Sequence, residues 1–274
     1  MGIPHISSRW YDAWYFRHSC GKPYERNEEW LRFFRAIADR IVAEIRPRTV
    51  LDVGCAMGFL VEALRDRGVE AFGIDISEFA IRQARDDIKA YVYVASVLDP
   101  LPSALPSRYD LVVCIEVLEH LPSNRVDEAI KRLCQLSDDI LFSSTPDDYR
   151  EITHLNVQPP EYWAERFALH GFFRDVDFDA SFITPWAARW RRSSDPFHRV
   201  VRNYERKFWR LWRENVELRT KLLEMRDELA RLEAIKDVSR HGENQYIRSC
   251  SLMTGMNKIK NFIKHCLTRL GWIP

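Results

Sequence analysis

Four residues in the first third of the chain have the types and spacing of a nucleotide-type binding site. Asp52 lies in a short β-branched run that leads to Gly54 and Gly58, and Asp75 ends the next apolar run. A strand that leads into a helix through glycines brings bare backbone and a helix N-terminus against a ligand. An acid about 20 residues further on, at the tip of the next strand, is placed to accept hydrogen bonds from ribose hydroxyls. The pattern therefore predicts a site for a nucleoside-containing ligand.

The glycine spacing excludes two common phosphate sites. A dinucleotide-binding loop has the pattern G-x-G-x-x-G, but Ala56 and Phe59 stand where its second and third glycines would be. A P-loop ends in Gly-Lys-Ser/Thr, and no lysine follows Gly58. The remaining pattern, D-x-G-x-x-x-G, suits a ligand with adenosine and an amino-acid arm but no pyrophosphate.

The hydrophobic pattern predicts the elements that position these residues. Strands are predicted near residues 49–53, 71–75, 91–95, 110–115 and 139–144, and helices near 59–67, 77–87, 124–136 and 162–170. Alternation of strands and helices predicts an α/β fold with a parallel sheet covered on both faces. Residues 1–45 are expected to be largely helical, with one buried apolar stripe.

Four motifs carry a resemblance to a known family. LDVGCAMG, GIDIS, YDLVVCIEVLEHLP and ILFSSTPD occur in this order at workable spacings. Over roughly residues 45–183 the chain resembles the class I S-adenosylmethionine-dependent methyltransferases. The resemblance implies a Rossmann-like, seven-stranded, mostly parallel sheet with flanking helices, and S-adenosylmethionine as the cofactor. It also implies a terminal antiparallel hairpin, expected within residues 171–183.

The resemblance assigns roles to residues of the predicted site. Asp52, Gly54 and Gly58 are expected to hold the methionine arm of the cofactor, and Asp75 its ribose. Many relatives place an aspartate after the third strand to meet the adenine amine, whereas this chain has Ser96 or Val97 there. The expected cofactor-binding residues are Asp52, Gly54, Cys55, Ala56, Gly58, Asp75, Ile76, Ser96, Val97 and Cys114.

Three further residues are candidates for catalysis. Glu116 is expected on the sulfonium side of the pocket, where its charge would favour the cation, or else is a solvated acid at a helix start. His154 is the preferred base, because it follows the fifth strand and imidazole accepts protons near neutral pH; the alternative is a loop histidine exposed to water. His120 is a second candidate base or a structural cap before Pro122. No metal site is expected, and Tyr11, Trp14, His18 and Tyr24 are candidates for a lid over the acceptor.

Composition describes an ordinary globular protein. The chain has 274 residues, of which 46% are hydrophobic and 30% charged. No apolar run approaches the ~20 residues that a membrane-spanning helix needs, and no secretion signal is evident. The six cysteines show no paired or metal-binding spacing. These features predict a cytoplasmic protein with reduced thiols.

Four domains are expected along the chain. They are an N-terminal helical lid (1–45), a methyltransferase domain (46–184), a linker with a coiled-coil helix (185–238) and a basic amphipathic tail (239–274). Within the tail, a predicted helix over 257–270 carries lysines beside an apolar face. Such a helix can lie at the inner face of a membrane as a peripheral contact, or dock on a protein.

A heptad pattern predicts that residues 204–235 form a coiled coil. Position a holds Phe208, Asn215, Leu222 and Leu229, and position d holds Leu211, Leu218, Met225 and Leu232. The asparagine at an a position favours two strands. The partner is a second copy in a homodimer or another protein, and the alternative is packing on the catalytic domain itself. In a parallel pair Glu214 would meet Arg219, but Lys221 would face Arg226.

The function expected first is O-methylation of a sugar or glycan hydroxyl. The segments HLNVQPPEYW and RHSCG resemble those of methyltransferases in bacterial cell-surface polysaccharide (O-antigen-type) biosynthesis. One alternative acceptor is the hydroxyl of a small molecule, such as a quinone or natural product. Another possibility is a cofactor-binding scaffold that recruits a glycosyltransferase through its coiled coil. A nucleic-acid substrate is not favoured, because the heptad explains most of the arginine and aromatic residues between 186 and 212.

Overall fold

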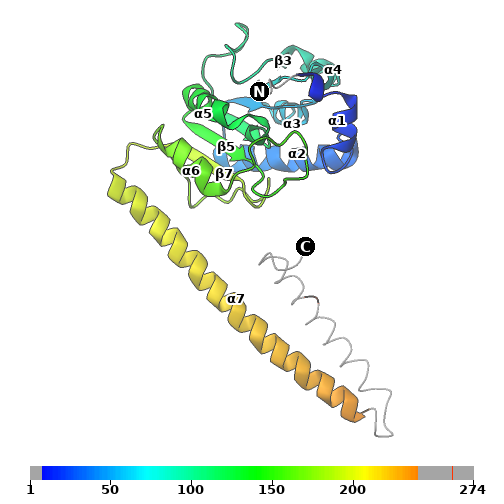
Figure 1. The fold of residues 1–274 in the computed structure, drawn as a ribbon, viewed down its shortest axis with the longest axis vertical. Coiled ribbons are helices and arrows are strands. Elements are labelled where there is room, and N and C mark those ends of the chain that lie inside the picture. Colours follow the sequence, from blue (N-terminus) through cyan, green and yellow to red (C-terminus); the bar gives the residue numbers. More distant parts are fainter. Residues whose placement is uncertain (1–7, 240–260, 262–274) are drawn as a thin grey trace. The chain divides into compact units, whose positions relative to one another are not determined.

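The chain folds into two compact units, Met1–Phe197 and His198–Pro274. The computed structural model describes residues 8–239 and Asn261 (Figure 1). The first unit contains the sheet and the predicted site, and the second contains a long helix.

Among the described residues, seven strands form one sheet in the order β3-β2-β1-β4-β5-β7-β6. The strands are β1 (Thr49–Val53), β2 (Glu70–Asp75), β3 (Val92–Val94), β4 (Leu111–Ile115), β5 (Asp139–Ser143), β6 (Phe172–Arg174) and β7 (Ala188–Arg192). Strands β1 to β5 pair in parallel, whereas β7 is antiparallel to β5 and to β6. This topology confirms the predicted Rossmann-like α/β fold.

Helices cover both faces of the sheet (Figure 1). Helices α5 (Ser123–Leu136) and α6 (Pro160–Ala168) bury Leu133 and Phe167 in a core shared with Val112 of β4. Helices α2 (Glu28–Arg40) and α3 (Phe59–Arg65) bury Ile37 and Leu64 in a second core shared with Val113. Successive residues of a strand point to opposite faces, so Val112 and Val113 serve the two cores.

Shorter helical pieces complete the first unit. They are α1 (Ala13–His18), α4 (Glu78–Arg82), 3-10 turns at Ser8–Trp10, Asp86–Tyr91 and Leu118–His120, and a π-helical turn at Ile41–Ile45. The helix predicted over 77–87 is therefore shorter than expected and is followed by a separate turn. The side chain of Ser77 caps α4 by accepting a hydrogen bond from the amide of Ala80 at 3.0 Å.

The sheet extends past residue 184, the end of the methyltransferase domain predicted from the sequence. Strand β7 lies in the range assigned to the linker, and β6 and β7 are separated by residues 175–187, so the hairpin predicted within 171–183 is wrong in its extent. Arg189 forms an ion pair with Asp139 of β5, and Trp190 stacks on Phe167 with ring centroids 4.9 Å apart. Arg191 and Arg192 reach Asp175 and Asp138, so each of the three arginines of this strand has an acidic partner.

Helix α7 is continuous over the 43 residues Phe197–Ser239, and all of it except Phe197 belongs to the second unit. It includes the whole heptad segment, so the predicted helix is confirmed, while its pairing stays a prediction. Within residues 8–239, no helix has the length and apolar content to cross a membrane. The amphipathic helix predicted over 257–270 lies outside the described residues, apart from Asn261.

Candidate active site

The predicted site lies at the carboxyl ends of β1 and β4, where the order of the strands reverses. The chain runs from β1 outward to β2 and β3, then returns so that β4 pairs with the other side of β1. Ligands of open α/β sheets bind in the crevice at such a switch point. The glycine loop, Asp75 and the Glu116–His120 segment all follow strands that end at this edge.

Two glycines of the loop after β1 occupy positions that a side chain would disturb. Gly54 has φ of +78°, and a Cβ there would overlap Cγ2 of Val117. Gly58 has φ of +73° and stands at the N-cap of α3. The amides of Gly54 and Cys55 donate to the carbonyl of Ile74 at 2.8 and 3.0 Å, which ties the loop to the end of β2. At Gly54 and Gly58 the loop therefore presents backbone atoms and no side chains.

Cys55 packs beneath the loop. A Cβ on Gly73 of β2 would lie 2.6 Å from Sγ of Cys55, so the thiol occupies the space that a side chain at 73 would fill. Cys55 and Cys114 are both buried, and burial raises the pKa of each thiol above its ordinary value. Their side chains belong to the core, and their backbone alone lies at the edge of the site. Gly73 was not among the predicted residues, although its place two residues before Asp75 was a visible signal.

Asp75 is held rigidly at the tip of β2. One carboxylate oxygen accepts from the amide of Ala56 at 2.9 Å, and the other accepts from the amide of Ser77 at 2.7 Å. Each oxygen has a further lone pair that can accept a ligand hydroxyl. Burial raises the pKa of Asp75, and the two amide hydrogen bonds partly offset this rise. The adjacent Ile76 packs in the aromatic cluster that Tyr11 and Phe16 also join.

Asp52 is a buried carboxyl group close to this negative charge. It is 5% exposed, and burial together with the charge of Asp75 raises its pKa to about 8. In the ligand-free protein Asp52 is therefore largely protonated at pH 7. A cation bound here would favour its ionised form.

Ser96 and Val97 follow the short strand β3. Val97 is buried in the main core, and the hydroxyl of Ser96 accepts a hydrogen bond from the amide of Leu98 at 3.1 Å. The amide of Ala95 donates to the carbonyl of Asp75 at 2.9 Å, which brings this turn next to Asp75. Ser96 is partly exposed and so is the better placed of the two to meet a ligand.

Glu116 is oriented by two hydrogen-bond donors. Its Oε1 accepts from the hydroxyl of Ser143 at 2.6 Å and from the indole of Trp186 at 2.9 Å. Its backbone has φ of +53°, a left-handed conformation that a non-glycine residue adopts at a cost. Glu116 is thus a positioned carboxylate and not a solvated acid at a helix start. No local pattern points to Trp186, because it lies 70 residues away along the chain.

His120 and His154 lie against each other, with ring centroids 4.7 Å apart. Nδ1 of His120 donates to the carbonyl of Thr153 at 3.2 Å and to its hydroxyl at 3.0 Å, because that hydroxyl spends its own proton on Glu151; Nδ1 of His154 donates to the carbonyl of Asp148 at 2.8 Å. A carbonyl only accepts, so these bonds place the proton on Nδ1 and leave a lone pair on Nε2 of each ring. Burial and the neighbouring His154 lower the pKa of His120 to about 3. The side chain of His154 is only 9% exposed, so it is not a loop histidine surrounded by water.

Glu119 is a buried acid beside the histidine pair. Its carbonyl accepts from the amides of Leu155 and Asn156, both at 2.8 Å, which holds the loop that carries His154. Its Oε2 has no partner among the described residues, and burial raises the pKa of Glu119 strongly. One atom each from Glu119, His120 and His154 lie within 4.8 Å of one another, a set that can hold a metal ion. The expectation of no metal site rested on sequence spacing, which cannot show residues that only the fold brings together.

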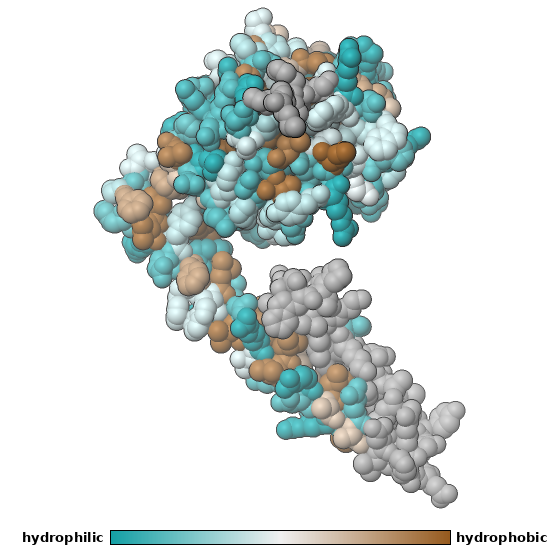
Figure 2. Space-filling model, in the orientation of Figure 1, coloured by the Kyte–Doolittle hydropathy of each residue, from teal (hydrophilic) through white to brown (hydrophobic). Residues whose placement is uncertain are grey.

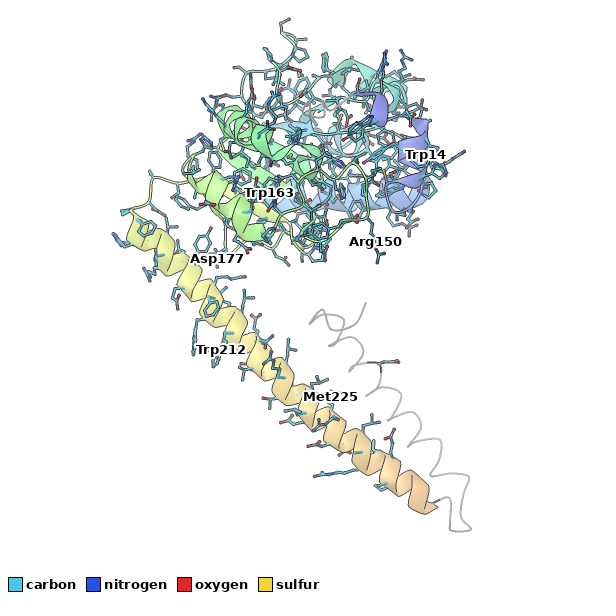
Figure 3. The ribbon with its side chains drawn as sticks, viewed as in Figure 1. Trp14, Arg150, Trp163, Asp177, Trp212 and Met225 are labelled. Atoms are coloured by element: carbon cyan, nitrogen blue, oxygen red, sulfur yellow. The ribbon has the colours of Figure 1, made fainter. Side chains whose placement is uncertain are left out.

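Part of the predicted N-terminal lid reaches this edge. Tyr11 and Tyr15 contact His120 edge-on, with centroids 5.6 and 6.3 Å from its ring. The carbonyl of Tyr11 accepts from the hydroxyl of Ser77 at 2.5 Å. Trp14 is 63% exposed and points to solvent, and His18 stacks on it (Figure 3). Tyr24 stacks on Phe59 in the core. Of the predicted lid residues Tyr11 contacts His120, and Tyr15, which the sequence did not predict, contacts it as well.

Comparison with protein families matches the chain over residues 24–218 to a methyltransferase domain. Since the match spans more than half of the chain, the chain belongs to this family of methyltransferase domains.

Several proteins of known name are similar to part of the chain. The ubiquinone biosynthesis O-methyltransferase of Bordetella avium is 30% identical over 149 residues, which cover 51% of this chain and 57% of that protein. The protein of the same name from Nitrosomonas europaea is 32% identical over 111 residues, or 39% of this chain and 47% of that protein. The chain thus spans about half the length of these relatives.

Solved structures support the fold. Magnesium protoporphyrin IX methyltransferase from Synechocystis, solved with bound S-adenosylmethionine, has a TM-score of 0.50 at 18% identity and covers 70% of this chain and all of that one. The 1,6-didemethyltoxoflavin-N1-methyltransferase of Burkholderia thailandensis has a TM-score of 0.50 at 15% identity, with 71% and 94% covered. At this identity the likeness concerns the architecture alone.

Proposed function

We propose that this protein is an S-adenosylmethionine-dependent O-methyltransferase that acts on a hydroxyl group of a small molecule. The proposal rests on two groups of residues that lie at the same edge of the sheet. The first is the glycine loop together with Asp75, and the second is the pair His120 and His154, whose Nε2 atoms each have a lone pair. The first group fits a cofactor, and the second fits the removal of a hydroxyl proton. The family match and the names of the similar proteins support the same chemistry.

The charges of the site fit S-adenosylmethionine better than a dinucleotide. Asp52 and Asp75 are two acids whose pKa values are raised by burial, and within the described residues no neighbouring cation lowers either value. S-adenosylmethionine carries a positive ammonium and sulfonium group, together with ribose hydroxyls. A pyrophosphate would add negative charge beside two acids, which is unfavourable. Asp52 and the Gly54–Gly58 loop would hold the amino-acid arm, and Asp75 the ribose.

The bound cofactor supplies a methyl group on a positively charged sulfur, ready for in-line transfer. The protein must then orient a hydroxyl oxygen toward that carbon and take up its proton. Nε2 of His154 accepts the proton, while the bond from its Nδ1 to the carbonyl of Asp148 fixes the ring. His120 stays neutral at pH 7, since its pKa is lowered to about 3, and it positions His154 by ring contact. Tyr11 and Tyr15 lie against His120 and shield its ring from solvent.

The acceptor that the comparisons favour is a small aromatic or quinone-type molecule. The proteins similar in sequence are named for ubiquinone biosynthesis, and none of those compared above is named for polysaccharides. The aromatic side chains beside His120 suit a flat ring as well as a sugar. A glycan acceptor of the cell-surface type is therefore the second candidate, supported by the resemblance of the segment around His154.

Calorimetric titration with S-adenosylhomocysteine tests the cofactor site. Wild-type protein should bind in the micromolar range, and Asp75→Ala should weaken binding at least about 100-fold, because it removes a carboxylate that accepts two ribose hydrogen bonds. Asp99→Asn, which changes an acid after β3, is the matched control and should bind normally. Absence of binding by folded wild-type protein would refute the cofactor assignment.

An acceptor screen then separates the substrate classes. Methyl transfer from labelled S-adenosylmethionine is measured to catechols and demethylated quinone precursors, and in parallel to sugars and glycans. Transfer to phenolic hydroxyls supports the proposal, whereas transfer to sugars alone replaces it with the glycan acceptor. Cofactor binding without transfer to either class would favour a scaffold function.

A further inference from the structure

Helix α7 carries an apolar seam that the structure leaves accessible. The seam consists of the a and d residues of the heptad: Phe208, Leu211, Asn215, Leu218, Leu222, Met225, Leu229 and Leu232. Phe208 is 65% exposed and Leu211 51% exposed, and the others of the seam are partly exposed. Figure 2 shows hydrophobic side chains at intervals along α7 between hydrophilic ones. Most of the stability of a helix comes from packing of its apolar face, so the partly exposed seam of this 43-residue helix is a candidate surface for a partner helix.

The charges beside the seam oppose a parallel pair. In that arrangement each g residue faces the e residue of the partner's next heptad. Glu214 would then meet Arg219, which is attractive. Lys221 would face Arg226, and Glu228 would face Glu233, and both pairs are repulsive.

An antiparallel pair reverses this balance. There each a residue packs against a d residue of the partner, and g residues face g residues. When Asn215 is set opposite Leu218, Glu214 faces Lys221 and Lys207 faces Glu228. Each of these attractive pairs occurs twice, because the arrangement has twofold symmetry.

The residues at the e positions also face attractive partners in this register. Residues at e face residues at e in an antiparallel pair, so Glu205 faces Arg226, another attraction. Trp212 faces Arg219, where a guanidinium can lie over the indole. The seam layers are also matched, since Phe208 packs on Met225 and Leu211 on Leu222. Tyr204, at a further d position, packs on Leu229.

In antiparallel registers shifted by one heptad, like charges face each other. A shift by one heptad in one direction sets Lys221 against Lys221 and Glu214 against Glu228. A shift in the other direction sets Glu214 against Glu214 and Lys207 against Lys221. The register around Asn215 and Leu218 also places the two asparagines in adjacent layers, about 4.5 Å apart along the axis, where their amides can pair.

We propose that α7 binds α7 of a second copy of this chain as an antiparallel coiled coil centred between Val216 and Glu217. The homodimer is held by the seam, and its direction and register are selected by the charges beside it. The local ion pairs of α7, such as Arg213 with Glu217 at 3.7 Å, are exposed and bind on the outer side of the helix.

Charge reversal in the full-length protein tests direction and register together. Glu214→Lys sets the new lysine against Lys221 twice and should raise the dimer dissociation constant about tenfold or more by sedimentation equilibrium. Lys221→Glu should weaken the dimer equally. The double variant restores both pairs and should return to within about threefold of wild type. In a parallel dimer Lys221→Glu would relieve repulsion with Arg226 and strengthen association, which would overturn the proposal.

A matched control and a distance measurement complete the test. Asp227→Lys changes a charge at an outward f position and should leave the dissociation constant unchanged. Spin labels on noncanonical residues, which leave the six native cysteines in place, are introduced at Thr220 or at Ala234. Their separations along the axis should be about 10 Å and about 50 Å in the antiparallel dimer. Similar short distances at both sites, or a folded monomer at every concentration, would overturn the proposal; circular dichroism confirms that each variant is folded.

Discussion

Asp52 and Asp75 show how burial tunes two acids of the same site differently. Asp75 accepts two amide hydrogen bonds that lower its pKa, whereas within the described residues no hydrogen bond offsets the rise of the Asp52 pKa to about 8. Asp52 therefore keeps its proton until a positively charged ligand binds and favours the ionised carboxylate. Burial of Asp52 thus costs stability at neutral pH, because the unfolded chain can release a proton that the folded protein keeps.

Replacing Asp52 by asparagine should stabilise the ligand-free protein at high pH. The folded state keeps a proton on Asp52 that the unfolded chain releases above pH ~4, so stability from this group is full at low pH and is lost as pH rises from ~4 to ~8. Asp52→Asn should therefore raise Tm by roughly 5 °C at pH 8.5 and much less at pH 5. The same variant should bind S-adenosylhomocysteine more weakly. An equal Tm change at both pH values would contradict the assigned protonation.

Substitution of each histidine in turn should show that His154 is the base and that His120 positions it. His154→Gln should lower kcat about 100-fold or more without changing cofactor affinity, because it removes the proton acceptor. His120→Gln should lower kcat about tenfold, since His120 acts through His154. His170→Gln, just beyond the end of α6, is the control. Loss of wild-type activity with a chelator, restored by a divalent cation, would show instead that Glu119, His120 and His154 act as metal ligands.

At the scale of elements, the conformation of the loop after β1 depends on the absence of a side chain at Gly54. Gly54 combines a left-handed backbone with a Cβ position that overlaps Val117, while Gly68 has φ of +79° but open space around it. The comparison separates two costs that usually occur together. The conformational cost is common to both glycines, and the steric cost belongs to Gly54 alone.

Gly54→Ala should therefore be much more harmful than Gly68→Ala. The second variant should cost about 1 kcal/mol and leave cofactor binding unchanged. The first displaces Val117, at the start of the turn that carries His120, and should weaken S-adenosylhomocysteine binding at least about tenfold with a larger fall in Tm. Thermal melting and calorimetry on the two variants measure both effects, and equal behaviour would refute the steric argument.

The elements that the sequence predicts best are those that bury both faces. β4 has Leu111, Val112, Val113 and Cys114 fully buried, and such a run is recognisable without any tertiary information. β7 reads ARWRR, and its arginines pair with acids that the sequence pattern does not place beside them: Arg189 with Asp139, which is 50 residues away, Arg191 with Asp175 and Arg192 with Asp138. The same distinction holds in the site. The glycine loop and Asp75 form a local motif, whereas the contacts of Glu116 with Trp186 and of His120 with His154 exist only in the folded chain.

At the scale of the whole molecule, the boundary between the units lies at Phe197, after β7. All the candidate site residues belong to the first unit, and the proposed dimer seam belongs to the second. Binding of cofactor and association of copies are therefore expected to be separable functions of the chain.

Truncation tests this division. A fragment of residues 1–197 should fold, remain monomeric and bind S-adenosylhomocysteine within about threefold of the full chain. A fragment of residues 1–184 lacks β7, which leaves the edge of β5 unpaired and removes Trp190 from the core, a loss of roughly 3–5 kcal/mol from that side chain alone. It should be unfolded or aggregated by circular dichroism and size-exclusion chromatography. A stable 1–184 fragment would show that β7 is dispensable.

The position of β7 in the chain also affects how the protein is made. Because the strand that completes the sheet is followed directly by α7, the first unit has all its strands before the 43 residues of that helix are synthesised. At 5–20 residues per second, the ribosome needs about 2–9 s to add them. The strand that completes the sheet thus leaves the ribosome before the apolar seam of α7, so we expect the sheet to close before the proposed seam can meet another nascent chain.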